Sequence, residues 1–202
     1  EKKDHPALKV FRKIEALQPD DLSVSLKIAL IYYESRRTDR AIEKFKEILQ
    51  AHPGSDRVIY YLGVIYENVK KDEEALGEFA KVSEDSTYFR DAQLHQAYLH
   101  HRRKEEESTI AILQRAIARK PEVAAFYEYL AEILRGRGHP EEAIQTLKTG
   151  IARSQERESL TYALGTLYDR TGHFNESIGA MHEVLRINPN NANALNYIGY
   201  SY

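Results

Sequence analysis

Apolar residues recur along this chain at helical spacing, and the pattern returns at intervals of 34 residues. In the motif Ile59-x-x-Leu62-Gly63-x-x-Tyr66 and in the following Ala75-x-x-x-Phe79, large, small and aromatic residues lie three or four positions apart, on one face of a helix. Each motif predicts an amphipathic helix, and the polar residues between the two predict a turn. The copies in the same register are Ser25-x-x-Ile28-Ala29-x-x-Tyr32, Thr161-x-x-Leu164-Gly165-x-x-Tyr168 and Leu195-x-x-Ile198-Gly199-x-x-Tyr202.

The register of this pattern predicts the domain organisation. Aligned on it, the repeats need no insertion or deletion. Residues 4–21 match the second helix of a repeat, and residues 192–202 match the first helix of another. Between them we expect five complete repeats, which span residues 22–55, 56–89, 90–123, 124–157 and 158–191. The two half-repeats at the ends lead us to expect that the chain is part of a longer array.

Two places in each repeat explain why the helices would pair. The eighth place holds a small residue, because a branched side chain there would overpack the pair at a cost of about 1–3 kcal/mol. In four of the repeats the eleventh place holds a tyrosine that fills the space between repeats. The small residues are Ala29, Gly63, Ala97, Ala131, Gly165 and Gly199, and the aromatic residues are Tyr32, Tyr66, Tyr168 and Tyr202. The 90–123 repeat departs most from the pattern, with Gln93, Gln96 and His100 in place of large apolar or aromatic residues, and we expect it to be the least stable interior part.

This pattern of large, small and aromatic residues at a 34-residue period resembles the tetratricopeptide repeat family, including bacterial members. The resemblance implies an all-α fold, an α-solenoid of helix-turn-helix repeats with about twelve antiparallel helices in a superhelix. It also implies a protein–protein interaction scaffold. In this family the first helices of successive repeats line a concave groove that holds a peptide segment or a helix of a partner.

Carried over place by place, the resemblance implies a groove rich in tyrosine. The implied groove residues are Leu26, Leu30, Tyr33, Tyr60, Tyr61, Val64, Leu94, His95, Tyr98, Glu128, Tyr129, Glu132, Arg135, Tyr162, Asp169, Arg170, Asn196, Tyr197 and Tyr200. Tyrosine suits a recognition surface because it combines a large contact area with a hydroxyl group. The alternative is that part of this stripe packs one first helix against the next. The Lys and Asn residues of the family's carboxylate clamps are absent, so we expect no affinity for the acidic C-termini of chaperones.

Composition excludes several other classes of protein. The formal net charge of −2 argues against nucleic-acid binding, which needs a basic surface. No apolar run approaches the roughly 20 residues of a membrane-spanning helix, and without cysteine there is no disulfide or thiolate chemistry. No phosphate-binding loop or zinc-binding helix motif occurs, so we predict no enzyme activity, no cofactor and no metal. His95, His100 and His101 are either exposed or satisfied histidines, or a pH-sensitive contact in the binding surface.

Three functional hypotheses follow. The leading one is binding of a peptide segment or helix of a partner protein in the groove. The second is a structural module whose copies stack end to end through the apolar faces of Phe11 and Ile14 and of Leu195 and Ile198, giving weak self-association. The third is the targeting arm of a larger enzyme or envelope-assembly protein. The sequence leaves the compartment open between the cytoplasm and a bacterial periplasm or envelope.

Overall fold

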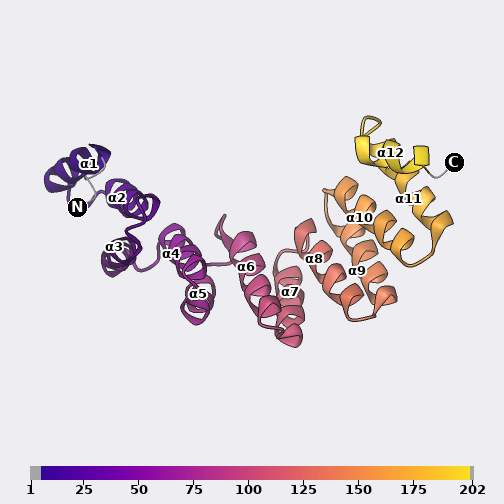
Figure 1. The fold of residues 1–202 in the computed structure, drawn as a ribbon, viewed down its shortest axis with the longest axis horizontal. Helices are drawn as coiled ribbons and strands as arrows, with labels where there is room; N and C mark the ends of the chain where they lie inside the picture. Colours follow the sequence, from indigo (N-terminus) through magenta and orange to yellow (C-terminus); the bar gives the residue numbers. More distant parts are fainter. Residues whose placement is uncertain (1–5, 201–202) are drawn as a thin grey trace. The chain divides into compact units, whose positions relative to one another are not determined.

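A computed structural model describes residues 6–200, which form helices joined by turns, with no strand in that range (Figure 1). The helices are α1 (Pro6–Leu17), α2 (Leu22–Glu34), α3 (Thr38–Ala51), α4 (Asp56–Asn68), α5 (Asp72–Phe79), α6 (Phe89–Arg102), α7 (Glu106–Arg119), α8 (Ala124–Gly136), α9 (Pro140–Arg153), α10 (Arg157–Arg170), α11 (Phe174–Ile187) and α12 (Ala192–Tyr200). These twelve helices in the described residues confirm the predicted all-α class. Tyr202, together with residues 4, 5 and 201 of the predicted half-repeats, lies outside the described residues.

The chain divides into two compact units, Glu1–Gln96 and Ala97–Tyr202. In the first unit, α1 packs on α2, α2 on α3, and α4 on α5. In the second unit, α8 packs on α9, α9 on α10, α10 on α11, and α11 on α12 (Figure 1). Neighbours in the sequence are therefore neighbours in space, as predicted for a solenoid of helix pairs. The first helices of the pairs are α2, α4, α6, α8, α10 and α12.

The core of each pair is built from the predicted apolar positions. Phe45, Phe79 and Leu113, on second helices, are fully buried. Two glycines of the first helices show how closely the helices approach: Gly63 lies against the ring of Phe79, and Gly165 lies against Met181, which is also fully buried. Burying a side chain of this size contributes about 1.5–3 kcal/mol relative to leaving it exposed. The helix pairs are thus held together mainly by apolar burial along the stack.

The turn within each helix pair has the same backbone conformation throughout. One residue of the turn has a positive φ, and these residues are Arg36, Lys70, Lys104, Gly138 and Gly172. The amide of the next residue donates a hydrogen bond back to the preceding helix. In one of these turns the His139 amide donates to the Leu134 carbonyl at 2.9 Å. This bond is the outer hydrogen bond of a Schellman motif, which satisfies carbonyl groups at a helix end. Because the motif has a fixed length, it explains why the repeats keep one register.

Helix α5 departs from the other second helices. It has 8 residues and ends at Phe79, whereas α3, α7, α9 and α11 have 14 residues each. The segment 80–88 then leads to α6, and the Ser83 amide donates to the carboxylate of Asp56 at 2.8 Å. In α6, Gln96 is buried and its Nε2 has no hydrogen-bond partner among the described residues. The low stability expected for the 90–123 repeat stays a prediction.

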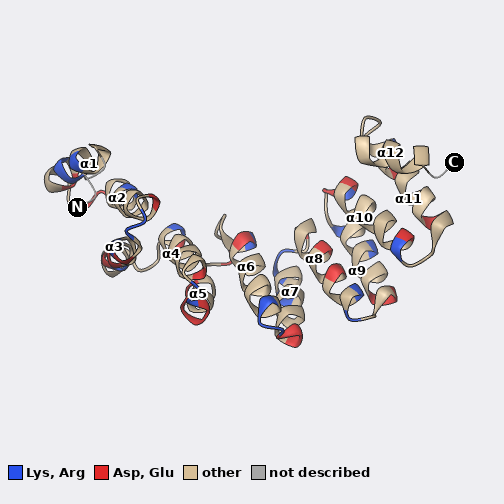
Figure 2. Cartoon of the chain, viewed as in Figure 1, with Lys and Arg blue, Asp and Glu red and all other residues tan. Residues whose placement is uncertain are grey.

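The charged run between α6 and α7 stabilises their turn. Basic residues end α6 and acidic residues begin α7 (Figure 2), so each charge suits the local helix dipole. His100 lies 2.5 Å from Glu105, through Nδ1 and Oε2. This hydrogen bond holds the pKa of the Glu105 carboxyl below its ordinary value. The side chain of Arg137 adds an ion pair to Glu107 at 2.7 Å.

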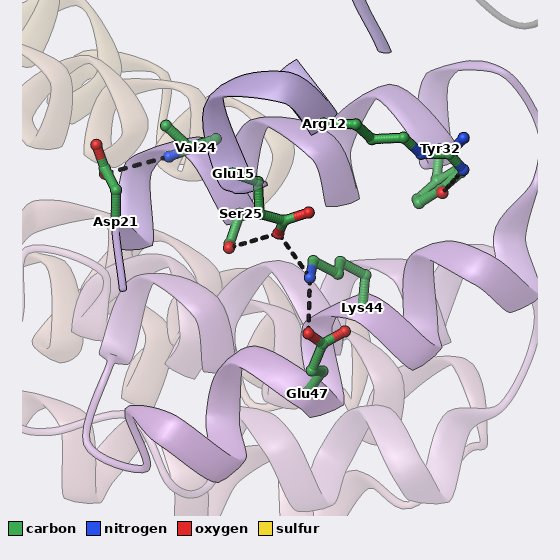
Figure 3. A network of polar contacts seen from close by, with 8 residues as sticks. All are labelled: Arg12, Glu15, Asp21, Val24, Ser25, Tyr32, Lys44 and Glu47. Carbon is green, nitrogen blue, oxygen red and sulfur yellow. Dashed lines mark hydrogen bonds and ion pairs between the residues drawn. The ribbon is translucent and has the colours of Figure 1, made fainter. Parts of the chain in front are cut away.

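A network of polar contacts connects the first three helices (Figure 3). The Lys44 ammonium of α3 lies 2.7 Å from the Glu15 carboxylate of α1 and 2.8 Å from that of Glu47. The Ser25 hydroxyl of α2 donates to the same Glu15 carboxylate at 2.9 Å. Burial lowers the pKa of Lys44, but the hydrogen bonds to Glu15 and Glu47 outweigh it, and the pKa is raised above its ordinary value.

Candidate functional site

The implied groove residues differ widely in how much surface they offer. Leu26 is only 2% exposed, so its side chain belongs to the core between helices; this corrects its placement in the groove. The half-buried residues are Leu30, Tyr33, Tyr60, Tyr61, Val64, Leu94, His95, Glu128, Tyr129, Arg135, Tyr162, Asp169 and Tyr197. The exposed residues are Tyr98, Glu132, Arg170, Asn196 and Tyr200.

In the first unit, Tyr60 and His95 form an aromatic cluster that joins neighbouring repeats. The Tyr60 ring lies 5.0 Å from the Tyr88 ring, and the His95 ring stacks on Phe79 at 4.9 Å. The Tyr60 hydroxyl is 3.3 Å from His95 Nε2, and His95 Nδ1 is 2.6 Å from the Glu67 carboxylate. Burial, followed by nearby acidic groups, raises the pKa of Tyr60. This part of the stripe therefore packs one repeat against the next.

Tyr33, also in the first unit, is hydrogen-bonded to α4, the next first helix. The Asn68 amide donates to its hydroxyl at 2.8 Å. Glu67, Asn68 and Tyr88 were absent from the implied groove residues. Tyr88 lies in the linker between α5 and α6, and place-by-place transfer considered only the first helices, so it could not find this residue.

In the second unit, α8 and α10 carry a charge cluster within the implied groove. The guanidinium of Arg135 makes two hydrogen bonds to the Glu132 carboxylate, at 3.0 and 2.5 Å. Arg170 approaches the same carboxylate at 3.8 Å. The hydrogen bond from Arg135 lowers the pKa of Glu132. The negative charge of Glu132 is therefore already compensated within the protein by these two arginines.

Aromatic groups precede this charge cluster in the second unit. The guanidinium of Arg102 lies 5.4 Å from the centre of the Tyr98 ring, and the His101 ring lies 6.3 Å from the Tyr129 ring in a T-shaped arrangement. Burial raises the pKa of Tyr129. Tyr98 remains 46% exposed, which leaves its ring open for contact with another molecule.

The second unit has a pocket of about 540 Å³ formed by α10, α11 and α12, called here the C-terminal pocket. Its volume lies in the range of ligand-binding clefts. It is lined by Tyr162, Asp169, Phe174, Ile178, Asn193, Asn196, Tyr197 and Tyr200. Five of these eight residues were among the implied groove residues.

Three residues of the C-terminal pocket were missed by the sequence argument. Phe174 and Ile178 lie on α11, a second helix, and only first helices were considered. Asn193 occupies the second place of its repeat, which the family pattern already assigns to the groove, so this residue could have been found. Phe174 is 62% exposed although it is large and apolar. Such a side chain at a pocket rim favours contact with another molecule.

A buried polar network fixes one wall of the C-terminal pocket. The Tyr197 hydroxyl donates to the Asp169 carboxylate at 2.7 Å. The hydroxyl of Ser177, itself fully buried, lies 2.8 Å from the Tyr197 hydroxyl and 2.8 Å from the Gly165 carbonyl. These bonds link α10, α11 and α12, and they hold Asp169 and Tyr197 in place before any ligand arrives.

The described residues offer no sign of two other kinds of site. Among residues 6–200, no three His, Asp or Glu side chains come together as metal ligands. None of the helices in that range is both long enough and apolar enough to cross a membrane.

The fold is similar to those of several solved structures. The crystal structure of MamA aligns with a TM-score of 0.59 at 22% identity, covering 79% of this chain and 93% of that chain. PilF of Pseudomonas aeruginosa aligns with a TM-score of 0.62 at 13% identity, covering 94% of this chain and 86% of that chain. YrrB, described as a TPR protein with an unusual peptide-binding site, aligns with a TM-score of 0.57 at 16% identity, covering 95% of this chain and 99% of that chain. At these identities the likeness shows the fold alone.

Comparison with curated protein sequences gives no match, whereas family models of the tetratricopeptide repeat match most of the chain. One model matches residues 7–56, 26–88 and 106–157, and another matches residues 160–191. Residues 89–105, which include α6 with its buried Gln96, lie between the matched segments. The matches, the 34-residue period and the paired helices agree, and the chain belongs to the tetratricopeptide repeat family.

Proposed function

We propose that this chain is a protein–protein interaction scaffold that binds a peptide segment or a helix of a partner protein on the tyrosine-rich face of its first helices. Proteins of the tetratricopeptide repeat family are protein-interaction scaffolds. The observation that carries the proposal is the C-terminal pocket, where aromatic rings, amides and one carboxylate converge around about 540 Å³. Rings and a few placed polar groups are the usual means of recognising a polypeptide segment.

Exposure separates the binding part of the tyrosine stripe from the structural part. Tyr98 and Tyr200 are 46% and 85% exposed, whereas Tyr60 and Tyr197 are engaged within the protein. We therefore assign the contacts with a partner to the exposed rings. The peptide-binding site named for YrrB, which has a similar fold, supports peptide recognition as a use of this architecture.

The proposal is tested by changing Tyr98 and Tyr200 together to alanine and repeating an affinity purification of partner proteins. We expect the proteins retained by the wild-type chain to be lost, because a recognition surface concentrates its binding energy in a few aromatic side chains. A control variant carries Val10→Ala and Val69→Ala, which remove exposed apolar side chains elsewhere. Retention of every partner by the tyrosine variant would exclude this face as the binding surface.

A further inference from the structure

We propose that the C-terminal pocket selects a lysine or arginine side chain of the partner segment as its anchor. This inference rests on the proposed function and names the chemistry of the partner at one site.

The charge of the C-terminal pocket comes from Asp169. No lysine, arginine or histidine is among the lining residues. The Tyr197 hydroxyl donates to one carboxylate oxygen of Asp169 at 2.7 Å, and among the described residues Asp169 forms no ion pair. Its sequence neighbour Arg170 approaches Glu132 instead, at 3.8 Å. A half-buried carboxylate with one neutral donor is stabilised by a cation, because the charge is only partly solvated.

The rings of the C-terminal pocket suit a cation as well. Tyr162, Phe174 and Tyr200 line it from α10, α11 and α12. The face of an aromatic ring carries negative charge and attracts ammonium and guanidinium groups within about 6 Å. The methylene stem of lysine or arginine would also cover the exposed ring of Phe174 and the side chain of Ile178, since long basic side chains pack their stems on apolar surface.

Two amides complete the C-terminal pocket on the α12 side. Asn193 and Asn196 are exposed, and neither side chain is hydrogen-bonded to another residue within the described part of the chain. An amide oxygen accepts a hydrogen bond from an ammonium or guanidinium group. The carboxylate of Asp169 and these two amides thus offer several acceptors to one donor-rich side chain.

Other anchors fit the C-terminal pocket less well. An acidic side chain would meet the carboxylate of Asp169 and be repelled. An apolar side chain would remove water from Asp169 without replacing it, which is costly for a charged group. The charge cluster on α8 and α10 lacks this selectivity, because Arg135 and Arg170 already compensate Glu132.

The inference is tested by selecting peptides from a display library of random twelve-residue sequences on three proteins: the wild-type chain, Asp169→Asn and Glu122→Gln. Asparagine keeps an oxygen that accepts the Tyr197 hydrogen bond but removes the charge. Glu122 is exposed and lies outside the lining residues, so its variant controls for the loss of one negative charge. We expect lysine or arginine at one fixed position of the peptides selected on wild type and Glu122→Gln, and no such preference on Asp169→Asn.

A second measurement leaves the protein unchanged. In the best selected peptide, arginine is replaced by citrulline, or lysine by norleucine, and the affinity is measured by fluorescence anisotropy. We expect binding to the wild-type chain to weaken at least tenfold, and binding to Asp169→Asn to change less than twofold. Equal weakening on both proteins, or no weakening on the wild-type chain, would overturn the inference.

The remaining outcomes separate this inference from the proposed function. Selected peptides that lack a basic residue would leave peptide binding in place and overturn the basic anchor. Failure to select any peptide above background would overturn both. Tetramethylammonium is added as a competitor, and displacement of the peptide at equal affinity would assign the pocket to a small organic cation instead.

Discussion

The glycine at position 63 makes room for the ring of Phe79: a Cβ atom on Gly63 would lie 2.7 Å from Cε1 of that ring. Real Cβ contacts are essentially never this short, and Phe79 is fully buried, so the ring has no free space to move into. A Cβ atom on Gly165 would lie 2.8 Å from the terminal methyl group of Met181 and 3.2 Å from the Cβ atom of Ala180. A flexible methionine adapts where a packed ring does not.

This difference predicts effects of different size for one substitution at two equivalent positions. We expect Gly63→Ala to lower the free energy of unfolding by roughly 1–2 kcal/mol, because overpacking outweighs the gain in helix propensity. We expect Gly165→Ala to change the stability by less than about 1 kcal/mol, because the gain in helix propensity offsets the small shift that the methionine and Ala180 must make. Urea denaturation followed by circular dichroism measures both. Equal effects at the two positions would show that the identity of the facing side chain does not matter.

Lys70 offers a position where glycine should stabilise the protein. Its φ is 62°, in the left-handed region that disfavours residues with a Cβ. Lys70→Gly should raise the free energy of unfolding by roughly 0.5–1 kcal/mol, since relief of strain exceeds the entropy that glycine adds to the unfolded chain. The neighbouring Lys71 has a φ of −94° and serves as the control. Lys71→Gly should lower the stability, and a gain there would contradict the argument.

Gln96 occupies a place where the other repeats carry leucine or isoleucine. It is buried, and its Nε2 lacks a hydrogen-bond partner among the described residues. Leaving a buried donor unsatisfied costs about 1–3 kcal/mol, so we expect Gln96→Leu to raise the stability by roughly 1–2 kcal/mol. The matched control is Gln145→Leu, because Gln145 is exposed. We expect this substitution to change the free energy of unfolding by less than about 0.5 kcal/mol. Thermal unfolding of both variants decides whether the 90–123 repeat is a weak point.

The hydroxyl of Tyr197 should matter for stability, whereas that of Tyr200 should not. Tyr197→Phe removes the bond to Asp169 and the contact with Ser177, and we expect a loss of roughly 0.5–1.5 kcal/mol per lost hydrogen bond. Tyr200 is 85% exposed, so Tyr200→Phe should change the stability by less than about 0.5 kcal/mol. Chemical denaturation of the two variants tests this. Equal stability of both would contradict a contribution of the Tyr197 hydroxyl to stability.

Glu132 predicts a pH dependence of stability. The hydrogen bond from Arg135 lowers its pKa in the folded state below the ordinary 4.5. The ionised carboxylate therefore favours the folded state above about pH 4.5, and this contribution is lost as the pH falls through the lowered pKa. We expect Glu132→Gln to lose less stability than wild type between pH 7 and pH 3, measured as urea midpoints. An identical loss in both proteins would contradict this origin.

The fold could be predicted from the sequence because the same pattern of large, small and aromatic residues recurs in several repeats. A helical period with a small residue at a fixed place determines both the helices and their pairing. The early end of α5 could not be predicted in this way. Local hydrogen bonds hold the segment that follows it: the Asp56 carboxylate accepts the Ser83 amide, and the Ser86 hydroxyl accepts the Tyr88 amide. Such polar side chains compete with helix formation.

The candidate surface was harder to predict than the fold. Transfer of family places included Tyr162 and Asp169, which line the C-terminal pocket. It misplaced Leu26, whose large apolar side chain is drawn into the core. It also missed Phe174, because only first helices were considered. Phe174 lies on a second helix and lines the C-terminal pocket because the surrounding side chains leave it exposed. Burial depends on the sizes of all surrounding side chains, which one repeat pattern does not specify.

The segment 80–88 gives the array a place where its length can vary. Within a helix pair the closed turn fixes the number of residues, and one inserted residue would rotate the next helix by about 100° and turn its apolar face to solvent. Between Phe79 and Phe89 no helix has to keep its phase. We therefore expect insertions and deletions acquired during evolution to gather at the exposed residues Asp85 and Thr87 of this segment, because Val82 is buried and Tyr88 packs on Tyr60. The same place is a suitable junction for grafting foreign repeats.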